Sequence, residues 1–194
     1  MIRASLVSMA ALLTFALSAP TAVAGPEAEA LIGDAAERIA MGEYRAADLS
    51  ALIDTERVAR FTLGRHARTI DAQDLERYSG ALETALHRAF QTGGAHLQSG
   101  QLDVVGSTDR NPRDSIVTTR IRVSGEAPLT VRWRVIERDG EWRVVDVEAL
   151  GLWLAIEQRA QVSAILGQRG ATIDDVISAF DRQVAKLETG ATRG

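Results

Sequence analysis

Few residues in this sequence combine the side-chain types that catalysis or metal binding requires. The three histidines, His66, His87 and His96, match no metal-binding spacing, and the sequence has no cysteine. Neither a glycine-rich phosphate loop nor a Gly-x-Ser-x-Gly nucleophile turn occurs. The adjacent carboxylates Asp174 and Asp175 stand at a predicted helix start, where the helix dipole favours negative charge without any catalytic role. We therefore expect no catalytic residue, no metal site and no cofactor.

Arginines alternate with apolar residues on the predicted strands, and this row has two interpretations. Its members are Arg120, Arg122, Arg132, Arg134 and Arg143. They could form a docking patch for an acidic partner. The more common arrangement is a solvated sheet face on which acidic residues of neighbouring strands pair with the arginines. The pattern favours the second interpretation and leaves the first open.

The first residues have the features of a cleaved secretory signal peptide. Arg3 supplies a positive start, an apolar run extends from Leu6 to Ala19, and Ala22 and Ala24 are the small residues that a cleavage site requires. The apolar run is shorter than the roughly 20 residues that cross a bilayer. The sequence therefore predicts a signal peptide over residues 1–24.

The remaining residues, 25–194, have the composition of one globular domain. Of the 194 residues, 46% are hydrophobic, and the mean hydropathy is −0.03. Because Arg3 is the only charged residue before Gly25, the mature chain carries 21 basic and 26 acidic side chains, a net charge of −5. A chain with this charge is a poor partner for nucleic acid.

The hydrophobic period changes twice along the chain. Helical spacing covers residues 26–92, a period of two covers 97–148, and helical spacing returns over 152–188. Four strands are expected near 97–105, 115–123, 129–138 and 141–148. The pattern predicts an α+β fold, with a four-stranded antiparallel sheet packed against helices.

Two of the predicted helices have clear signals. In "DTERVARFTLGRH" either Asp54 or Thr55 caps the helix start. A longer helix is capped by Asp71 and is expected to stop at Gly93–Gly94. Its apolar stripe consists of Leu75, Tyr78, Leu82, Leu86, Ala89 and Phe90.

The last two strands form a hairpin around Asp139-Gly140, and its register is open. A two-residue turn places Trp133 opposite Asp146. A three-residue turn places Trp133 opposite Val145 and Arg132 opposite Asp146. We favour the second register because it pairs apolar residues with each other.

One face of this hairpin and the segment after it are strongly apolar. The residues are Val131, Trp133, Val135, Leu152, Trp153 and Leu154. On general grounds they would form an ordinary core. The same periodicity would also suit the wall of a container, because periodicity alone does not distinguish a filled interior from a hollow one.

Two segments resemble the MlaC family of periplasmic phospholipid-binding, toluene-tolerance auxiliary proteins of ABC transporters. "IDTERVARFTLGRH" resembles the family helix D-x-E-R-x-A-R-x-x-L-G-R, and "VRWRVIERDGEWRVVDVEALGLWL" resembles its V-x-Y-R-L-x-x-x-D-G-x-W-x-V-x-D-V-x-x-x-G-V-S-L block. The resemblance implies a cone resembling nuclear transport factor 2, with lipid tails held in an apolar cavity between sheet and helices. The lipid-binding residues it implies are Phe61, Val131, Trp133, Val135, Leu152, Trp153 and Leu154.

The sequence departs from the family pattern after Gly151. Trp153 replaces a serine, Gln158 a tyrosine and Val162 a phenylalanine, and an indole at the pocket wall would shorten or reshape the pocket.

The resemblance also implies a function. The protein would be a monomeric periplasmic carrier, not an enzyme, that moves phospholipid between an outer-membrane lipoprotein complex and an inner-membrane ABC transporter complex, a role in outer-membrane lipid asymmetry. The alternative is an exported enzyme of the same cone-like fold, an isomerase or dehydratase with a small apolar substrate. That enzyme would need Asp146, Tyr78 or Asp103 to face the interior with a raised pKa.

Overall fold

The computed structural model describes residues 25–43, 46–98 and 101–191. The expected signal peptide and its cleavage site lie outside these residues. The helices are α1 (Pro26–Ala40), α2 (Ala46–Ala51), α3 (Thr55–Leu63), the 3-10 helix η1 (Gly64–Arg68), α4 (Ala72–Gln98), α5 (Leu154–Leu166) and α6 (Ile173–Ala191). The strands are β1 (Gln101–Asn111), β2 (Asp114–Arg122), β3 (Leu129–Arg138), β4 (Glu141–Ala149) and β5 (Leu152–Trp153).

The strands form one antiparallel sheet in the order β1-β2-β3-β4-β5. The predicted α+β class is confirmed, with one strand more than expected. β5 contains only two residues, Leu152 and Trp153, which pair with the end of β4 where a helix was predicted. A strand this short carries no periodicity, and α5 follows it directly at Leu154, two residues after the predicted helix start.

The predicted end of the long helix is wrong. α4 continues through Gly93 and Gly94 to Gln98, and β1 accordingly begins at Gln101 instead of residue 97. Glycine costs roughly 0.5–1 kcal/mol in a helix interior. A helix of 27 residues can absorb that cost, because its first turns are held by packing.

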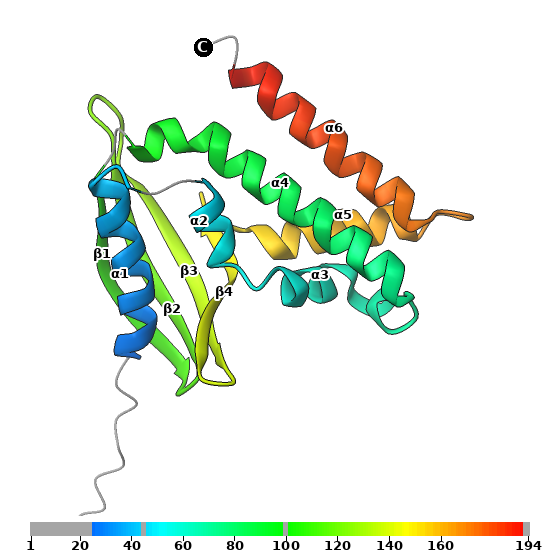
Figure 1. Cartoon of the computed structure of the whole chain (residues 1–194), viewed down its shortest axis with the longest axis horizontal. Helices are drawn as coiled ribbons and strands as arrows, with labels where there is room; N and C mark the ends of the chain where they lie inside the picture. Colours follow the sequence, from blue (N-terminus) through cyan, green and yellow to red (C-terminus); the bar gives the residue numbers. More distant parts are fainter. Residues whose placement is uncertain (1–24, 44–45, 99–100, 192–194) are drawn as a thin grey trace, which may run out of the picture.

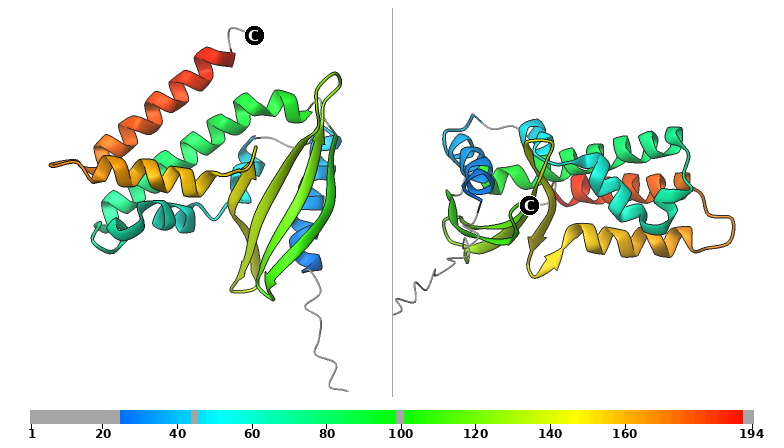
Figure 2. Two further views of the ribbon diagram at one scale, coloured as in Figure 1. Left: turned by 180° about the vertical axis from the view of Figure 1, so that it is seen from behind. Right: turned by 90° about the horizontal axis from the view of Figure 1, so that it is seen from below.

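α1 covers one face of the sheet (Figure 1). The opposite face, seen in Figure 2, carries no helix from residues 25–43, 46–98 or 101–191. Under α1 lies a filled cluster in which Ala28 and Ile32 meet the strands; its buried strand residues are Val117, Ile121, Val131, Trp133, Val135 and Val144. The Trp133 indole N–H donates to the Thr119 hydroxyl over 2.9 Å, so the buried polar group is satisfied.

The other helices, α3 to α6, pack beside the β4 edge of the sheet (Figure 1). Their core contains Ala59, Leu63, Tyr78, Leu82, Val162, Val176 and Phe180. The rings of Tyr78 and Phe180 stack with centroids 5.5 Å apart. Asp54 caps α3 by accepting a hydrogen bond from the Arg57 N–H over 3.0 Å, which confirms one of the two expected caps.

The register favoured for the β3–β4 hairpin is wrong. Asp139 and Gly140 both have positive φ, 55° and 85°, and form a two-residue turn that pairs Arg138 with Glu141. A bulge then shifts the register between Arg134 and Val135, so that Trp133 lies opposite Val147. The bulge restores apolar pairing, which the two-residue turn alone would have lost, because the extra residue moves the later part of β4 by one position.

The arginine row lies among acidic partners. Arg132 is opposite Glu148, not Asp146, and bonds to it over 2.8 Å, while Arg122 pairs with Asp103. Both Arg134 bonds go to Asp114, over 3.1 and 2.8 Å. This arrangement matches the solvated sheet face with cross-strand acids that the sequence favoured.

Candidate functional site

An apolar cavity of about 290 Å³ lies between β4 and helices α4, α5 and α6. Ile53 and Val58 complete the lining from the start of α3. The helices α4, α5 and α6 lie beside β4 at the edge of the sheet (Figure 1). The cavity lining consists of Ile53, Val58, Leu82, Ala85, Leu86, Ala89, Phe90, Val144, Val145, Asp146, Val147, Leu154, Ala155, Glu157, Gln158, Gln161, Phe180, Gln183 and Val184.

The α4 wall of the cavity is the far half of the predicted apolar stripe. Tyr78 is fully buried in the filled core, and Leu82, 5% exposed, belongs to that core and also reaches the cavity lining. Leu86, Ala89 and Phe90 continue the stripe along the cavity. Their spacing keeps them on one helix face, and Ala89 leaves room because its side chain is a single methyl group. The stripe is confirmed: its near half is buried in the core, and its far half, which packs only in part through Leu86 and Phe90, also faces the cavity.

The sheet wall depends on the bulge in β4. Because the register shifts there, Val144, Val145, Asp146 and Val147 all contribute to the lining, although a regular strand would turn alternate residues away. Asp146 Oδ1 accepts the backbone N–H of Val147 over 2.8 Å and that of Ala155 over 2.9 Å. These bonds tie β4 to the start of α5.

Burial raises the pKa of Asp146 above its ordinary value of 3.8, against the lowering effect of the two N–H bonds and of Arg134. Asp146 is thus a half-buried carboxyl in a mostly apolar wall.

The mouth of the cavity is more polar than its interior. Glu157, Gln161 and Gln183 are exposed lining residues, and Gln158 is half-buried. On α5 the lining residues Leu154, Glu157, Gln158 and Gln161 share one face. The arrangement suits an elongated apolar group inside and a polar group outside.

The residues predicted to bind lipid are not gathered in this cavity. Leu154 lines it and is 51% exposed. Val131, Trp133 and Val135 instead lie in the filled cluster under α1. Their alternation correctly predicted a buried face, but α1 packs directly against that face and leaves it no part of the cavity.

The other three predicted residues lie near the surface. Phe61 is 38% exposed and has the Arg159 guanidinium 5.1 Å from its ring centre. Leu152 is 54% exposed, and Trp153 lies under Arg132, 5.5 Å from ring centre to guanidinium carbon. Trp153 is therefore not part of the cavity wall, whereas Gln158, the other departure from the family pattern near it, is.

The cavity residues that the sequence analysis did not assign to a site are chiefly Leu86, Phe90, Val145, Phe180 and Val184. The signal that could have found them is the overlap of three apolar stripes, on α4, α6 and β4. Each stripe is visible in the sequence, but their meeting point depends on the packing of helices far apart in the chain.

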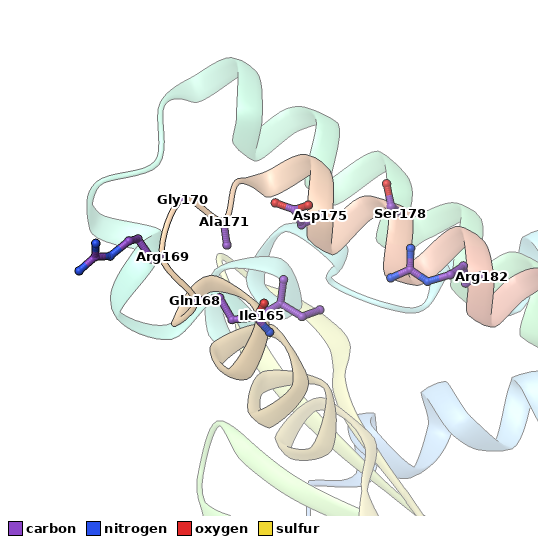
Figure 3. A pocket seen from close by; sticks show the side chains of 8 residues that line it. All are labelled: Ile165, Gln168, Arg169, Gly170, Ala171, Asp175, Ser178 and Arg182. Atoms are coloured by element: carbon purple, nitrogen blue, oxygen red, sulfur yellow. The ribbon is translucent and has the colours of Figure 1, made fainter.

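A larger hollow of about 490 Å³ lies at the α5–α6 turn, and Figure 3 shows the side chains around it. Arg169, Arg182, Asp175, Ser178 and Gln168 line it. Burying apolar groups against charged and polar side chains would leave the latter without water, so this hollow does not suit lipid tails.

The other two residues that an enzyme would need do not lie beside Asp146 in the described part of the cavity. Tyr78 is buried against Thr62, 2.7 Å between hydroxyl oxygens, and Asp103 pairs with Arg122, so neither joins Asp146 in the lining. His66 accepts a bond from Arg65 over 3.3 Å. Across the described ranges, no three His, Cys, Asp or Glu side chains are grouped to hold a metal, and no helix is both long and apolar enough to span a membrane.

Comparison with known proteins identifies a family and a fold. The family model described as MlaC protein matches residues 35–182, most of the chain. Among solved structures, a phospholipid-binding protein from Ralstonia solanacearum, in complex with a phospholipid, aligns with a TM-score of 0.67 at 18% identity. The alignment covers 85% of this chain and 98% of that chain. No curated protein matches the sequence.

Proposed function

The chain belongs to the MlaC family, and from this premise we propose that it carries phospholipid, with acyl tails inside the apolar cavity and the headgroup outside. The observation that carries the proposal is the cavity between β4 and helices α4, α5 and α6. Its interior is lined mainly by aliphatic and aromatic side chains, with the Asp146 carboxyl in the β4 wall, while Glu157 and the glutamines lie at the mouth. The phospholipid-binding protein from Ralstonia solanacearum supports the same function through its shared fold.

The energetics explain why such a carrier would be needed. Each methylene exposed to water costs about 0.8 kcal/mol, so a sixteen-carbon tail costs on the order of 13 kcal/mol to expose. A lipid therefore crosses an aqueous compartment only if the tails are covered. Covering them requires shape and apolar surface but no nucleophile, metal or acid–base pair.

The size of the cavity implies that loading widens it. Sites for drug-sized ligands occupy roughly 300–1,000 Å³, and this cavity, at about 290 Å³, is at the lower end of that range. A two-tailed phospholipid is larger than a drug-sized ligand. On this proposal α4, α5 or α6 moves away from β4 when lipid enters.

The finer parts of the proposal concern location and partners. We propose that the protein is periplasmic, exported by the signal peptide predicted over residues 1–24, and acts as a monomer. It would transfer phospholipid between an outer-membrane lipoprotein complex and an inner-membrane ABC transporter complex. The support for these partners is the family alone.

One observation favours the alternative of an exported enzyme. Asp146 lines the cavity and burial raises its pKa, as a general acid or base in an apolar pocket would require. However, its Oδ1 already accepts two backbone N–H groups, and neither Tyr78 nor Asp103 lies in the lining to act with it. A structural role accounts for the carboxyl.

The test is to fill the cavity. Ala89 is an exposed lining residue on α4, so Ala89→Trp should place an indole in the space for lipid while the fold persists. Ala85→Phe is a second filling variant, deeper in the same wall. The control is Ala164→Trp on α5, at an exposed position that does not line the cavity.

Lipid extracted from each purified protein is measured by mass spectrometry, beside a thermal melt. We expect lipid in wild type and Ala164→Trp and at least a several-fold loss in the filling variants, with cooperative melts throughout. Absence of lipid from wild type, or full lipid in both filling variants, would contradict the proposal.

A further inference from the structure

The charged groups in the cavity lining are of one sign. Among the described lining residues the only ionisable side chains are Asp146 on β4 and Glu157 on α5. The remaining polar side chains of the lining are glutamines, Gln158, Gln161 and Gln183. No arginine, lysine or histidine is found among them, so the lining offers nothing cationic to a phosphate group.

We propose that the cavity selects phospholipids with a zwitterionic, amine-bearing headgroup over phospholipids with a net anionic headgroup, and that Glu157 and Asp146 determine this choice. This inference rests on the proposed function, because it concerns the headgroup of a lipid whose tails occupy the same cavity.

Glu157 is placed to meet a headgroup. It is exposed, and it lies on the same face of α5 as Leu154, which also contributes to the lining while being 51% exposed. A lipid with tails against Leu154 therefore passes Glu157 where it leaves the cavity. Within the described structure no ion pair involving Glu157 is formed, so its carboxylate is available to a ligand.

Asp146 adds a second carboxyl deeper in the wall. Both of its backbone bonds fall on Oδ1, which leaves Oδ2 available to a ligand. Arg134 lies close enough to lower the pKa of Asp146, but its guanidinium bonds to Asp114 over 3.1 and 2.8 Å. A lipid ammonium at the mouth can donate to the Glu157 carboxylate and to the glutamine carbonyls, and the Asp146 carboxyl behind them adds to the negative potential there. A headgroup that carries a second phosphate, or only hydroxyl groups beside its phosphate, has no ammonium to donate.

The size of the preference follows from screened electrostatics at a partly exposed mouth. Two unit charges 4 Å apart in water interact strongly enough to change a binding constant by about five-fold. The effect grows where the site is less hydrated, and salt weakens it. When both lipid classes are offered at equal concentration, the amine-bearing lipid should therefore be bound in about five-fold excess at low ionic strength.

The experiment loads the mature protein from vesicles containing equimolar phosphatidylethanolamine and phosphatidylglycerol with identical acyl chains. The ratio of the two lipids in the repurified protein is measured by mass spectrometry at low and high salt. The variants are Glu157→Gln, Asp146→Asn and the double variant. Glu83→Gln serves as the control, because Glu83 is exposed on α4 and does not line the cavity.

Wild type and Glu83→Gln should favour the amine-bearing lipid by about five-fold at low salt. Each single variant should reduce that ratio, and the double variant should approach equal uptake. Asp146→Asn keeps an oxygen for the Val147 and Ala155 N–H groups, and Glu157 is on the surface, so both variants should fold.

Two results would overturn this inference and leave the proposed function standing. One is equal uptake of the two lipids by wild type, and the other is a lipid ratio that is the same in the double variant as in wild type. Absence of either lipid from folded wild type overturns the proposed function and this inference with it.

Discussion

Asp146 accepts a hydrogen bond from the backbone N–H of Ala155, 2.9 Å away, and so joins the bulged strand β4 to the first turn of α5. The first N–H groups of a helix have no partner within the helix. Trp153, which precedes α5, offers no side-chain cap, and Asp146 supplies the missing acceptor from another element. A single carboxylate oxygen therefore ties the α5 wall of the cavity to β4, beside the pairing of β4 with β5.

Replacing Asp146 separates this structural role from its charge. Asp146→Leu leaves the N–H groups of Val147 and Ala155 without their acceptor and should lower the free energy of unfolding by about 1–3 kcal/mol. Asp146→Asn keeps a carbonyl oxygen and should stay within about 1 kcal/mol of wild type. Urea denaturation of the three proteins measures both effects. Equal stability of the leucine variant would mean that the bonds contribute nothing.

Two aspartate substitutions should distinguish the filled core from the cavity. Val135 is fully buried under α1, so Val135→Asp costs several kcal/mol out of the about 5–15 kcal/mol typical of a domain and should unfold the protein. Leu154 lines the cavity and is 51% exposed, so Leu154→Asp should stay folded and lose bound lipid.

Circular dichroism melts and extracted-lipid mass spectrometry on both variants check the expectation. A folded Val135→Asp variant without lipid would instead place the tails against Val135, as the family resemblance implied. Leu154→Ala is the control for Leu154→Asp, because it removes the side chain without adding charge.

The α+β class and most helices could be predicted because they depend on local periodicity. The alternation of Val131, Trp133 and Val135 correctly predicted a buried face, and the spacing from Tyr78 to Phe90 correctly predicted a helical stripe. Local patterns record which side of an element is apolar. They contain no information on whether the opposing element fills the space.

The site was harder to predict because it depends on non-local geometry. The bulge in β4 turns Val145 and Asp146 toward the cavity, and a bulge has no signature in the alternation of a nine-residue strand. The contribution of Phe180 depends on α6 packing against α4, more than 80 residues earlier in the chain. By contrast, Trp133 was predicted to line the cavity because of the family resemblance. Its indole N–H donates to the Thr119 hydroxyl, so the side chain is accommodated in the core under α1.

Tyr78 should make stability fall at high pH. Burial raises its pKa from 10.0 to about 12, so between these values the unfolded chain loses a proton that the folded protein keeps. The free energy of unfolding should therefore fall by about 1.4 kcal/mol per pH unit between pH 10 and 12 on account of this group. Below pH 10 the contribution is constant, since both states are protonated.

Tyr78→Phe removes this pH dependence. Because all other groups that titrate at high pH are the same in both proteins, the difference between wild type and the variant isolates the effect of Tyr78. The variant should lose about 0.5–1.5 kcal/mol at neutral pH, because Thr62 keeps its bonds to the Val58 and Ala59 carbonyls. Urea denaturation from pH 8 to 12 gives the difference between the two proteins. A difference that does not change across this range would mean that Tyr78 ionises equally in both states.

The β4–β5 turn should be improved by a polar residue. Leu150 has φ of 53°, is 84% exposed and precedes Gly151, whose φ is 82°. A left-handed conformation costs an ordinary L-residue about 1–2 kcal/mol, and asparagine tolerates it better. Because the exposed leucine buries little surface, Leu150→Asn should raise the free energy of unfolding by about 0.5–1 kcal/mol, measured from urea denaturation.

The β3–β4 turn supplies the reverse experiment. Asp139 also has positive φ, 55°, and precedes Gly140, so Asp139→Leu should lower stability by about as much as Leu150→Asn raises it. The bond from Arg138 to Asp139, at 3.3 Å between exposed side chains, should add little to this loss.

If Leu150→Asn destabilises the protein while Asp139→Leu behaves as expected, the Leu150 side chain must contribute a stabilising contact that outweighs its backbone strain. If Leu150→Asn is more stable but takes up less lipid, the exposed leucine serves lipid transfer at a cost in stability.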